Sequence, residues 1–390
     1  MAGGRLRLLC HYHPGRPWST RPHALACAPA RGARDAKRTT RRAFAPRVTF
    51  PRPGPGRPTP LPRWRPTVGR QQGVRVTSRL ASRGAASGGT NGRRLSFGIK
   101  TTPAHTDYAD LLRVWREADG IERIEHAWLW DHLPPLFGPP TGPTWEGWTT
   151  LAALAASTER IGLGLLVSNN RLRPPALLAK MAATVEGISD GRLTVGLGMG
   201  PTLPRSGQPA APGPAARAVA GYRALGIEPP TPGVGLARLD ESCRVLRALW
   251  ENEEPTDFAG RHYRLTGAHA APRPARRLPL LIGGSGDGLL RVAAEHADLW
   301  NISGPPHADV ARVAERAAAL DAACAQLGRD PGEITRSVQT HVSYADPAAT
   351  RAVVTDLLTT GATHIVLSLP APFPEGVARW VTDEIIDAVG

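Results

Sequence analysis

The residues best suited to acid–base chemistry are Asp131 and His132, which stand side by side in the first half of the chain. They follow the apolar run HAWLW (126–130), a pattern typical of a buried strand. A histidine at the end of a strand can take or give a proton near neutral pH, and the adjacent aspartate can orient a loop or bond a ring nitrogen. The alternative interpretation is a structural Asp–His pair that caps the loop.

Glycines are concentrated at the ends of two other predicted strands. The first group is Gly196, Gly198 and Gly200 in VGLGMG (195–200), and the second is the turn formed by Gly283, Gly284, Ser285 and Gly286. The missing side chains of the first group either open room over a planar ligand or relieve crowding inside the fold. The second group precedes a predicted helix, where free backbone N–H groups can bind a phosphate. A simple tight turn would show the same composition.

An α/β scaffold has to position these residues, and from Leu95 onward short apolar runs alternate with amphipathic helices. We predict strands at 95–100, 126–130, 161–167, 193–198, 279–282, 298–302, 335–344 and 364–369. We predict helices at 107–119, 148–158, 174–187, 236–250, 289–296, 309–328, 350–360 and 377–389. Because the sequence offers no antiparallel edge or second domain, eight strictly alternating units favour a closed (β/α)8 barrel over an open sheet.

The carboxyl ends of barrel strands carry the active site in such folds, and the residues singled out above follow predicted strands. A Pro- and Ala-rich stretch at 201–220 interrupts the alternation. We expect it to be a mobile surface loop at the mouth of the barrel.

The basic character of the chain comes from its N-terminal segment. Residues 1–94 hold 20 Arg and one Lys against one Asp, a net charge of +20, whereas the remainder carries −5 of the whole-chain +15. We predict a disordered Arg- and Pro-rich tail followed by one barrel domain at 95–390. Stacking aromatic residues are sparse in the tail and no nucleic-acid-binding module accompanies it, so we expect no specific nucleic-acid partner. A transit peptide and an over-extended reading frame are the other interpretations of this segment.

The cysteines and the apolar runs exclude several classes of protein. Cys10, Cys27, Cys243 and Cys324 show no CxxC or metal-ligand spacing, so neither a disulfide framework nor a zinc site is indicated. No apolar run approaches the roughly 18 residues that a membrane span needs. We therefore expect a cytoplasmic enzyme that uses no metal and has no membrane partner.

Several long segments resemble the luciferase-like family, and specifically its deazaflavin-dependent branch, which uses coenzyme F420. The matching segments are AWLWDHLPP (127–135), WEGWTTLAALAASTERIGLGLLVSNN (145–170), RPPALLAKMAATVEGISDGRLTVGLGMG (173–200), GYRALGIEPP (221–230), RLDESCRVLRALW (238–250), FAGRHYRL (258–265) and PLLIGGSGDGLLRVAAEHADLWN (279–301). They occur in family order and cover essentially all of 95–390. The resemblance implies a luciferase-like TIM barrel with insertions after strands 3 and 4.

The resemblance also implies roles for individual residues. It places Asp131 and His132 near the reactive edge of the cofactor ring, with His132 as the residue for proton transfer and Glu146 second to it. Glu146 also opens a helix, where it could instead complement the helix dipole. Leu166 and Val167 match a bulge that backs the ring, often with a non-prolyl cis peptide. The implied cofactor-binding set is completed by Ser168, Asn170, Gly198, Gly200, Gly283, Gly284, Ser285 and Gly286.

The function that the resemblance implies is F420-dependent hydride transfer between the deazaflavin and a small organic substrate. An FMN-dependent monooxygenase of the same fold is the alternative, because the cofactor decides whether oxygen is activated. The sequences of two segments, EGWTTLAALAA and ALLAKMAAT, favour the deazaflavin branch. The third hypothesis is a cofactor-binding or nucleic-acid-tethered protein without catalysis. Its support is the basic tail together with Pro201, which stands where relatives often carry Trp or a catalytic Glu. Dimerisation is common among relatives, so a homodimer is left open.

Overall fold

The computed structural model describes residues 94–204 and 213–390. The predictions for the tail lie outside the described residues, apart from Arg94. No helix in the described ranges is long and apolar enough to cross a membrane.

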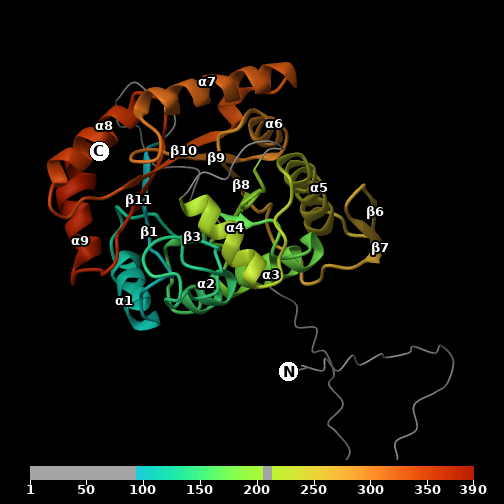
Figure 1. The fold of residues 1–390 in the computed structure, drawn as a ribbon, viewed down its shortest axis with the longest axis horizontal. Helices are drawn as coiled ribbons and strands as arrows, with labels where there is room; N and C mark the ends of the chain where they lie inside the picture. The colour runs from blue at the N-terminus through green and yellow to red at the C-terminus, as the bar shows by residue number, and fades with distance from the viewer. Residues whose placement is uncertain (1–93, 205–212) are drawn as a thin grey trace, which may run out of the picture. The chain divides into compact units, whose positions relative to one another are not determined.

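Parallel strands form the centre of the barrel domain (Figure 1), and eight of them make up its ring. They are β1 Ser96–Lys100, β2 His126–Leu129, β3 Gly162–Leu165, β5 Leu193–Gly198, β8 Leu280–Gly283, β9 Leu299–Ser303, β10 Thr335–His341 and β11 His364–Ser368. Each strand pairs with the next, β3 also pairs with β5, and β11 pairs with β1, so that the ring closes. The predicted (β/α)8 barrel is confirmed.

Helices alternate with the strands and cover the outside of the ring (Figure 1). They are α1 Tyr108–Asp119, α2 Gly147–Ala155, α3 Pro175–Ile188, α5 Pro232–Glu251, α6 Asp287–His296, α7 Val310–Gln326, α8 Pro347–Leu358, and, after β11, α9 Val377–Val381, a π-helical turn at Thr382–Ile386 and α10 Asp387–Val389. Helix α1 shows why they pack there. Its buried residues Leu111, Val114, Trp115 and Ala118 recur at helical spacing and form one apolar stripe.

The two predicted insertions are present, after the third and the fourth strand of the ring. A two-residue strand, β4 Ser168–Asn169, follows β3 and pairs with the end of β5. Helix α4, Pro214–Ala224, follows β5, and an antiparallel hairpin of β6 Thr256–Ala259 and β7 Arg264–Ala268 follows α5. The hairpin is a separate two-stranded sheet, so it leaves the ring without an antiparallel edge.

The expectation of a loop throughout 201–220 is wrong from Pro214 onward, where α4 begins. Proline at the first helical position has a φ angle that already suits a helix, and the following AARAVA is rich in alanine. The helix therefore forms in a segment whose overall Pro and Gly content indicated a loop. The expectation for residues 205–212 lies outside the described part of the chain.

A polar layer closes the amino-terminal end of the barrel interior. The rings of His126 and His364, the first residues of β2 and β11, stack at 3.8 Å between centroids. Trp128 Nε1 donates to His126 Nδ1 at 2.6 Å, and Ser337 Oγ lies 2.8 Å from His364 Nδ1. Burial lowers the pKa of His364 to about 4 and that of His126 well below its ordinary value. Both rings are therefore neutral at pH 7, at the end of the barrel opposite to the expected site.

Candidate functional site

Asp131 follows β2 and is held by an arginine that the sequence interpretation did not single out. Arg173 donates to both carboxylate oxygens, at 2.6 and 3.1 Å, and the backbone N–H of Asn169 donates at 3.1 Å. The side chain of Asp131 is 0% exposed and that of Arg173 is 10% exposed. Burial raises the pKa of Asp131, and the Arg173 guanidinium opposes that rise. Both oxygens are occupied, so Asp131 ties the loop after β2 to the segment after β4.

Glu146 caps the start of α2 and also binds Arg173. Its carboxylate accepts from the backbone N–H groups of Trp148 and Thr149 at 3.1 and 2.7 Å. Burial raises the pKa of Glu146, but the hydrogen bonds from Thr149 and the Arg173 charge outweigh burial and leave the pKa below its ordinary value. The carboxylate is thus ionised at neutral pH. This geometry fits a charge that complements the helix dipole.

His132 is partly exposed and stays neutral at pH 7. Its Nδ1 lies 3.4 Å from Tyr222 Oη, and the same hydroxyl donates to the backbone carbonyl of Asp131 at 3.3 Å. The edge of the Trp130 ring approaches it, with 5.2 Å between ring centroids. Burial and the nearby Lys100 charge lower the pKa of His132 to about 4. The imidazole is therefore in its neutral form at pH 7, with one ring nitrogen unprotonated.

Helix α4 brings Tyr222 to this histidine by lying against the loop after β2. A Cβ on Gly221 would stand 2.6 Å from Pro134 Cγ, so only glycine permits this approach without a shift. Arg217 on the same helix donates to the carbonyl of Gly138 at 2.5 Å. Beside these contacts, residues 136–138 and the start of α4 line a hollow of about 600 Å³.

The Leu166–Val167 segment forms the expected bulge between β3 and β4, and its peptide bond is cis. Val167 fills the space over two glycines: a Cβ on Gly198 would stand 2.5 Å from Val167 Cγ2, and one on Gly283 2.7 Å from Val167 Cγ1. A Cβ on Gly196 would stand 2.0 Å from the backbone oxygen of Leu165. Of the two interpretations of the glycine group, relief of crowding accounts for Gly196 and Gly198.

The polar side chains after the bulge differ in whether the protein itself supplies their hydrogen-bond partners. Ser168 is buried, and its Oγ accepts from Trp148 Nε1 at 2.9 Å. Gly200 has a φ of +73°, and a Cβ there would stand 2.1 Å from Asn169 Oδ1. Asn170 is 4% exposed, and its Oδ1 has no hydrogen-bond partner among the described residues. Since buried polar atoms are nearly always paired, Asn170 is the member of this group best suited to a ligand.

The turn after β8 leaves open space at the start of α6. Gly284 has a φ of +128°, and its N–H donates to the Asn301 carbonyl at 2.9 Å. A Cβ on Gly286, the N-cap residue of α6, would meet none of the described residues within 4 Å, and Ser285 beside it is partly exposed. An anion can therefore approach the first backbone N–H groups of α6. Asp287 in the first turn is paired with Arg316 of α7, which offsets its charge.

Lys100, the last residue of β1, lies at the same end of the barrel. Its Nζ donates to Gln339 Oε1, and burial lowers its pKa to about 8. With Arg173 and Tyr222, it is a residue of the mouth that sequence reasoning missed. Its signal was its place at the end of a predicted strand, while Arg173 and Tyr222 lay within segments quoted for the family resemblance without being singled out.

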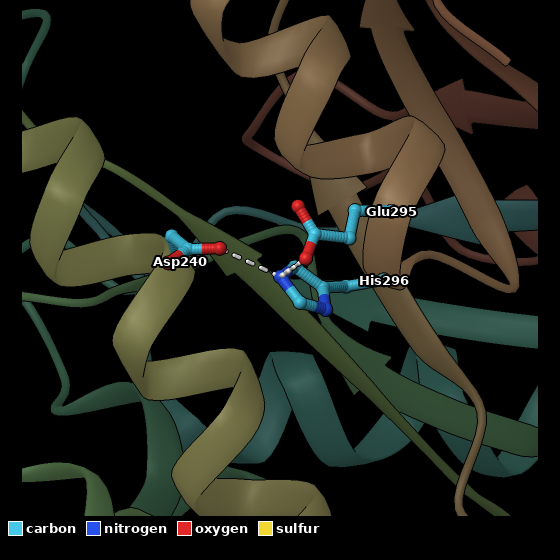
Figure 2. A group of neighbouring side chains, drawn as sticks. All are labelled: Asp240, Glu295 and His296. Carbon is cyan, nitrogen blue, oxygen red and sulfur yellow. Dashed lines mark hydrogen bonds and ion pairs between the residues drawn. The ribbon is translucent and has the colours of Figure 1, made fainter. Parts of the chain in front are cut away.

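Three potential metal ligands lie together on the outside of the barrel, between α5 and α6 (Figure 2). His296 Nε2 is 2.8 Å from one oxygen of Asp240, and Glu295 stands 3.8 Å from the same nitrogen. Arg244 pairs with the other oxygen of Asp240 at 2.8 Å. We interpret the group as a polar contact between two helices, because the guanidinium already supplies the cation.

A closed parallel barrel with polar side chains gathered at the carboxyl ends of its strands is typical of an α/β-barrel enzyme. Residues 95–379 match the model of the luciferase-like monooxygenase family, so the chain belongs to that family. It is an oxidoreductase of the luciferase-like kind.

Curated relatives of two kinds share this sequence. The chain is 28% identical to an F420-dependent glucose-6-phosphate dehydrogenase of Kineococcus radiotolerans over 66% of this chain and 71% of the relative. It is 31% identical to the pyrimidine monooxygenase RutA of Stutzerimonas stutzeri over 47% of each chain, so the match spans about half of that relative.

Solved structures share the fold at low sequence identity. An F420-dependent secondary alcohol dehydrogenase in complex with an F420–acetone adduct superposes with a TM-score of 0.64 and 17% identity, over 76% of this chain and 100% of the other. The monooxygenase RslO1 of Streptomyces bottropensis superposes with a TM-score of 0.59 and 20% identity over the same shares.

Proposed function

We propose that this chain is an F420-dependent oxidoreductase that transfers a hydride between the deazaflavin and a small organic substrate. The observation that carries the proposal is a neutral, partly exposed His132 at the end of β2, in the same mouth as the Leu166–Val167 bulge. The F420-dependent relative supports the choice of cofactor, because its match covers more of the chain than the match to RutA does.

The residues present fit a planar cofactor with a phosphate group. Val167 supplies an apolar surface at the mouth, seated on Gly198 and Gly283. The unpaired Oδ1 of Asn170 can accept a hydrogen bond from a ring N–H. The open space at Gly286 admits a phosphate to the start of α6.

A bound deazaflavin supplies a ring carbon that takes or gives a hydride and suppresses reaction with oxygen. His132 then takes the substrate proton when the hydride leaves, or returns it in the reverse direction. Burial raises the pKa of Tyr222 to about 12, so its hydroxyl keeps its proton and donates to the carbonyl of Asp131. The Tyr222 oxygen can accept from Nδ1–H of His132, which leaves Nε2 to exchange the proton with the substrate.

Asp131, Arg173 and Glu146 hold this arrangement rather than move protons. Arg173 bridges the two carboxylates and so joins the loop after β2, the segment after β4 and the start of α2. His132 comes directly after Asp131 in the chain, so this ion-pair network fixes its backbone.

An FMN-dependent monooxygenase is the second candidate, favoured by the similarity to RutA. Binding of F420 and of FMN to the purified full-length chain, followed by cofactor fluorescence, separates the two. We expect F420 to bind at least about tenfold more tightly than FMN, a difference of about 1.4 kcal/mol in binding free energy. A preference for FMN would assign the chain to the oxygen-activating enzymes, and binding of neither would overturn both proposals.

Single-turnover reduction of bound F420 by a panel of alcohols and aldehydes tests the role of His132. The variant His132→Ala should bind F420 unchanged and lose roughly two to four powers of ten in the hydride-transfer rate. His269→Ala is the matched control, because this histidine is exposed in the connection after the β6–β7 hairpin. Equal rates in the two variants would remove His132 from proton transfer.

A further inference from the structure

Lys100 carries a charge into the barrel mouth, and no carboxylate among the described residues is paired with it. Its Nζ donates to Gln339 Oε1, and Gln339 Nε2 in turn donates to Ser303 Oγ at 2.7 Å. Both partners are neutral. Within residues 94–204 and 213–390, no acidic side chain forms an ion pair or a hydrogen bond with this ammonium group. A cation in this position lacks the counter-ion that partly buried charges ordinarily have.

The strand register places polar residues level with Lys100 on the inner face of the barrel. Lys100 pairs with Ser368 of β11, and Ser368 pairs with His341 of β10. Val366, two residues before Ser368, packs inside the barrel against Trp128. Because alternate residues of a strand share a face, Ser368 also faces the interior, and its neighbours at the same level do so too.

Ser368 provides a second, independent sign of a ligand. The residue is 6% exposed, and its Oγ has no hydrogen-bond partner in the described part of the chain. A buried hydroxyl without a partner is rare in proteins. In strand register Ser368 lies between Lys100 and His341, the exposed last residue of β10, so three potential donors stand at one level of the barrel.

Three histidines complete the surroundings of Lys100. His132 follows β2, His307 follows β9 and His341 is the last residue of β10. Burial is the largest cause of the lowered pKa of each, and the Lys100 charge lowers it further. The rings of His307 and His341 meet edge to face at 5.1 Å. At neutral pH these imidazoles are uncharged and can donate hydrogen bonds without adding repulsion.

We propose that Lys100, Ser368 and His341 form a subsite for an oxyanion of the substrate, so that the substrate is a small organic carboxylate or phosphate ester. The inference rests on the proposed function. It places the anion on the arc β10–β11–β1, away from the β3–β5–β8 arc that carries the bulge and the glycine turn. His132 follows β2, which lies between the two arcs. The reacting carbon then lies near His132 while the anionic end of the substrate binds Lys100.

The chain contains three lysines, Lys37, Lys100 and Lys180, so one labelling experiment carries its own control. The full-length protein is treated with acetic anhydride across pH 6–10, with and without inorganic phosphate or oxalate, and the acylation of each lysine is measured by mass spectrometry. Lys180 is exposed on α3 and bonds only the backbone carbonyl of Ala271 among the described contacts. At an anion concentration ten times its Kd, acylation of Lys100 should slow about tenfold and its midpoint pH should rise, while Lys180 stays unchanged.

The variants Ser368→Ala and His341→Gln keep Lys100 in place and should each weaken the protection at least about threefold, which is roughly 0.7 kcal/mol of binding free energy. Equal protection in these variants, or no protection of Lys100 by either anion, would overturn the subsite. Full protection by F420 alone, with no further effect of phosphate or oxalate, would also overturn it, because the anion would then belong to the cofactor. F420 binding is followed separately by fluorescence, so failure to bind the cofactor contradicts the proposed function and leaves the labelling result to judge the subsite.

Discussion

Replacing Arg173 by methionine should destabilise the protein far more than the loss of an ordinary ion pair. The substitution leaves the Asp131 carboxylate, whose side chain is 0% exposed, without its two charged hydrogen bonds. Removing one partner of a buried pair costs about 3–5 kcal/mol, which raises the unfolding equilibrium constant by roughly two to four powers of ten. Urea denaturation of the cofactor-free protein at pH 7.5 measures this cost directly.

Two further variants make the result specific to burial. Arg312→Met breaks the exposed pair with Glu315 on α7, where the ion-pair distance is 2.6 Å, and should cost less than about 1 kcal/mol. The double variant Asp131→Asn with Arg173→Met removes both charges and should recover a large part of the loss, because no buried charge is left unpaired.

The pH dependence of the Arg173→Met variant supplies the sign of the effect. Burial raises the pKa of Asp131 and Arg173 holds it down, so without Arg173 the folded-state pKa rises further above the unfolded value. A group with a raised folded-state pKa contributes stability at low pH that is lost as the pH rises. The deficit of the variant should therefore be smaller at pH 5 than at pH 8. A deficit below about 1 kcal/mol, or one that adds fully to that of Asp131→Asn, would refute the view that this pair anchors the site.

Three more variants test other features of the barrel. Burial lowers the folded-state pKa of His364 to about 4, so the wild-type protein should lose on the order of 3 kcal/mol of stability as the pH falls from 6.5 to 4. His364→Gln should make this loss smaller, and urea midpoints of both proteins at pH 7.5 and 4.5 measure the difference. Gly198→Ala should cost about 1–3 kcal/mol of stability, because its Cβ would stand 2.5 Å from Val167 Cγ2. Adding Val167→Ala to this variant should recover part of the loss in a thermal melt, and no recovery would contradict this reason. Tyr222→Phe should change the tautomer of His132 in 15N NMR spectra, because the lost hydroxyl lies 3.4 Å from Nδ1; an unchanged tautomer would dismiss the assignment of Nε2 to proton exchange.

The barrel could be predicted from the sequence because each strand and helix is a local pattern. The apolar run that becomes β2 is buried at every position, and the spacing of Leu111, Val114, Trp115 and Ala118 predicts the buried face of α1. Helix α4 escaped prediction because Pro214 and the glycines around it signal a loop by composition, although proline at the first position suits a helix.

The site could be predicted only as far as the strand ends that carry it. Asp131 and His132 were found because they follow a strand, but the role of Asp131 depends on Arg173, which lies 42 positions further along the chain. Whether Glu146 holds a proton depends on its two backbone hydrogen bonds and on the same arginine. Such contacts between connections are set by the packing of the closed barrel, and no local pattern in the sequence records them.

Histidines at the two ends of the barrel share a low pKa but differ in role because of where they lie. The pKa is lowered to about 4 for His364 at the amino-terminal end and for His132 and His341 at the mouth. His364 is buried, and its ring stacks on His126 while Ser337 bonds its Nδ1, so protonation there can only oppose folding. His132 is partly exposed at the carboxyl end of the strands, where a proton taken from a bound molecule stays in contact with the reaction. The same low pKa is therefore a stability property at one end of the barrel, and at the other it keeps His132 in the neutral form that the function proposed above requires of a proton acceptor.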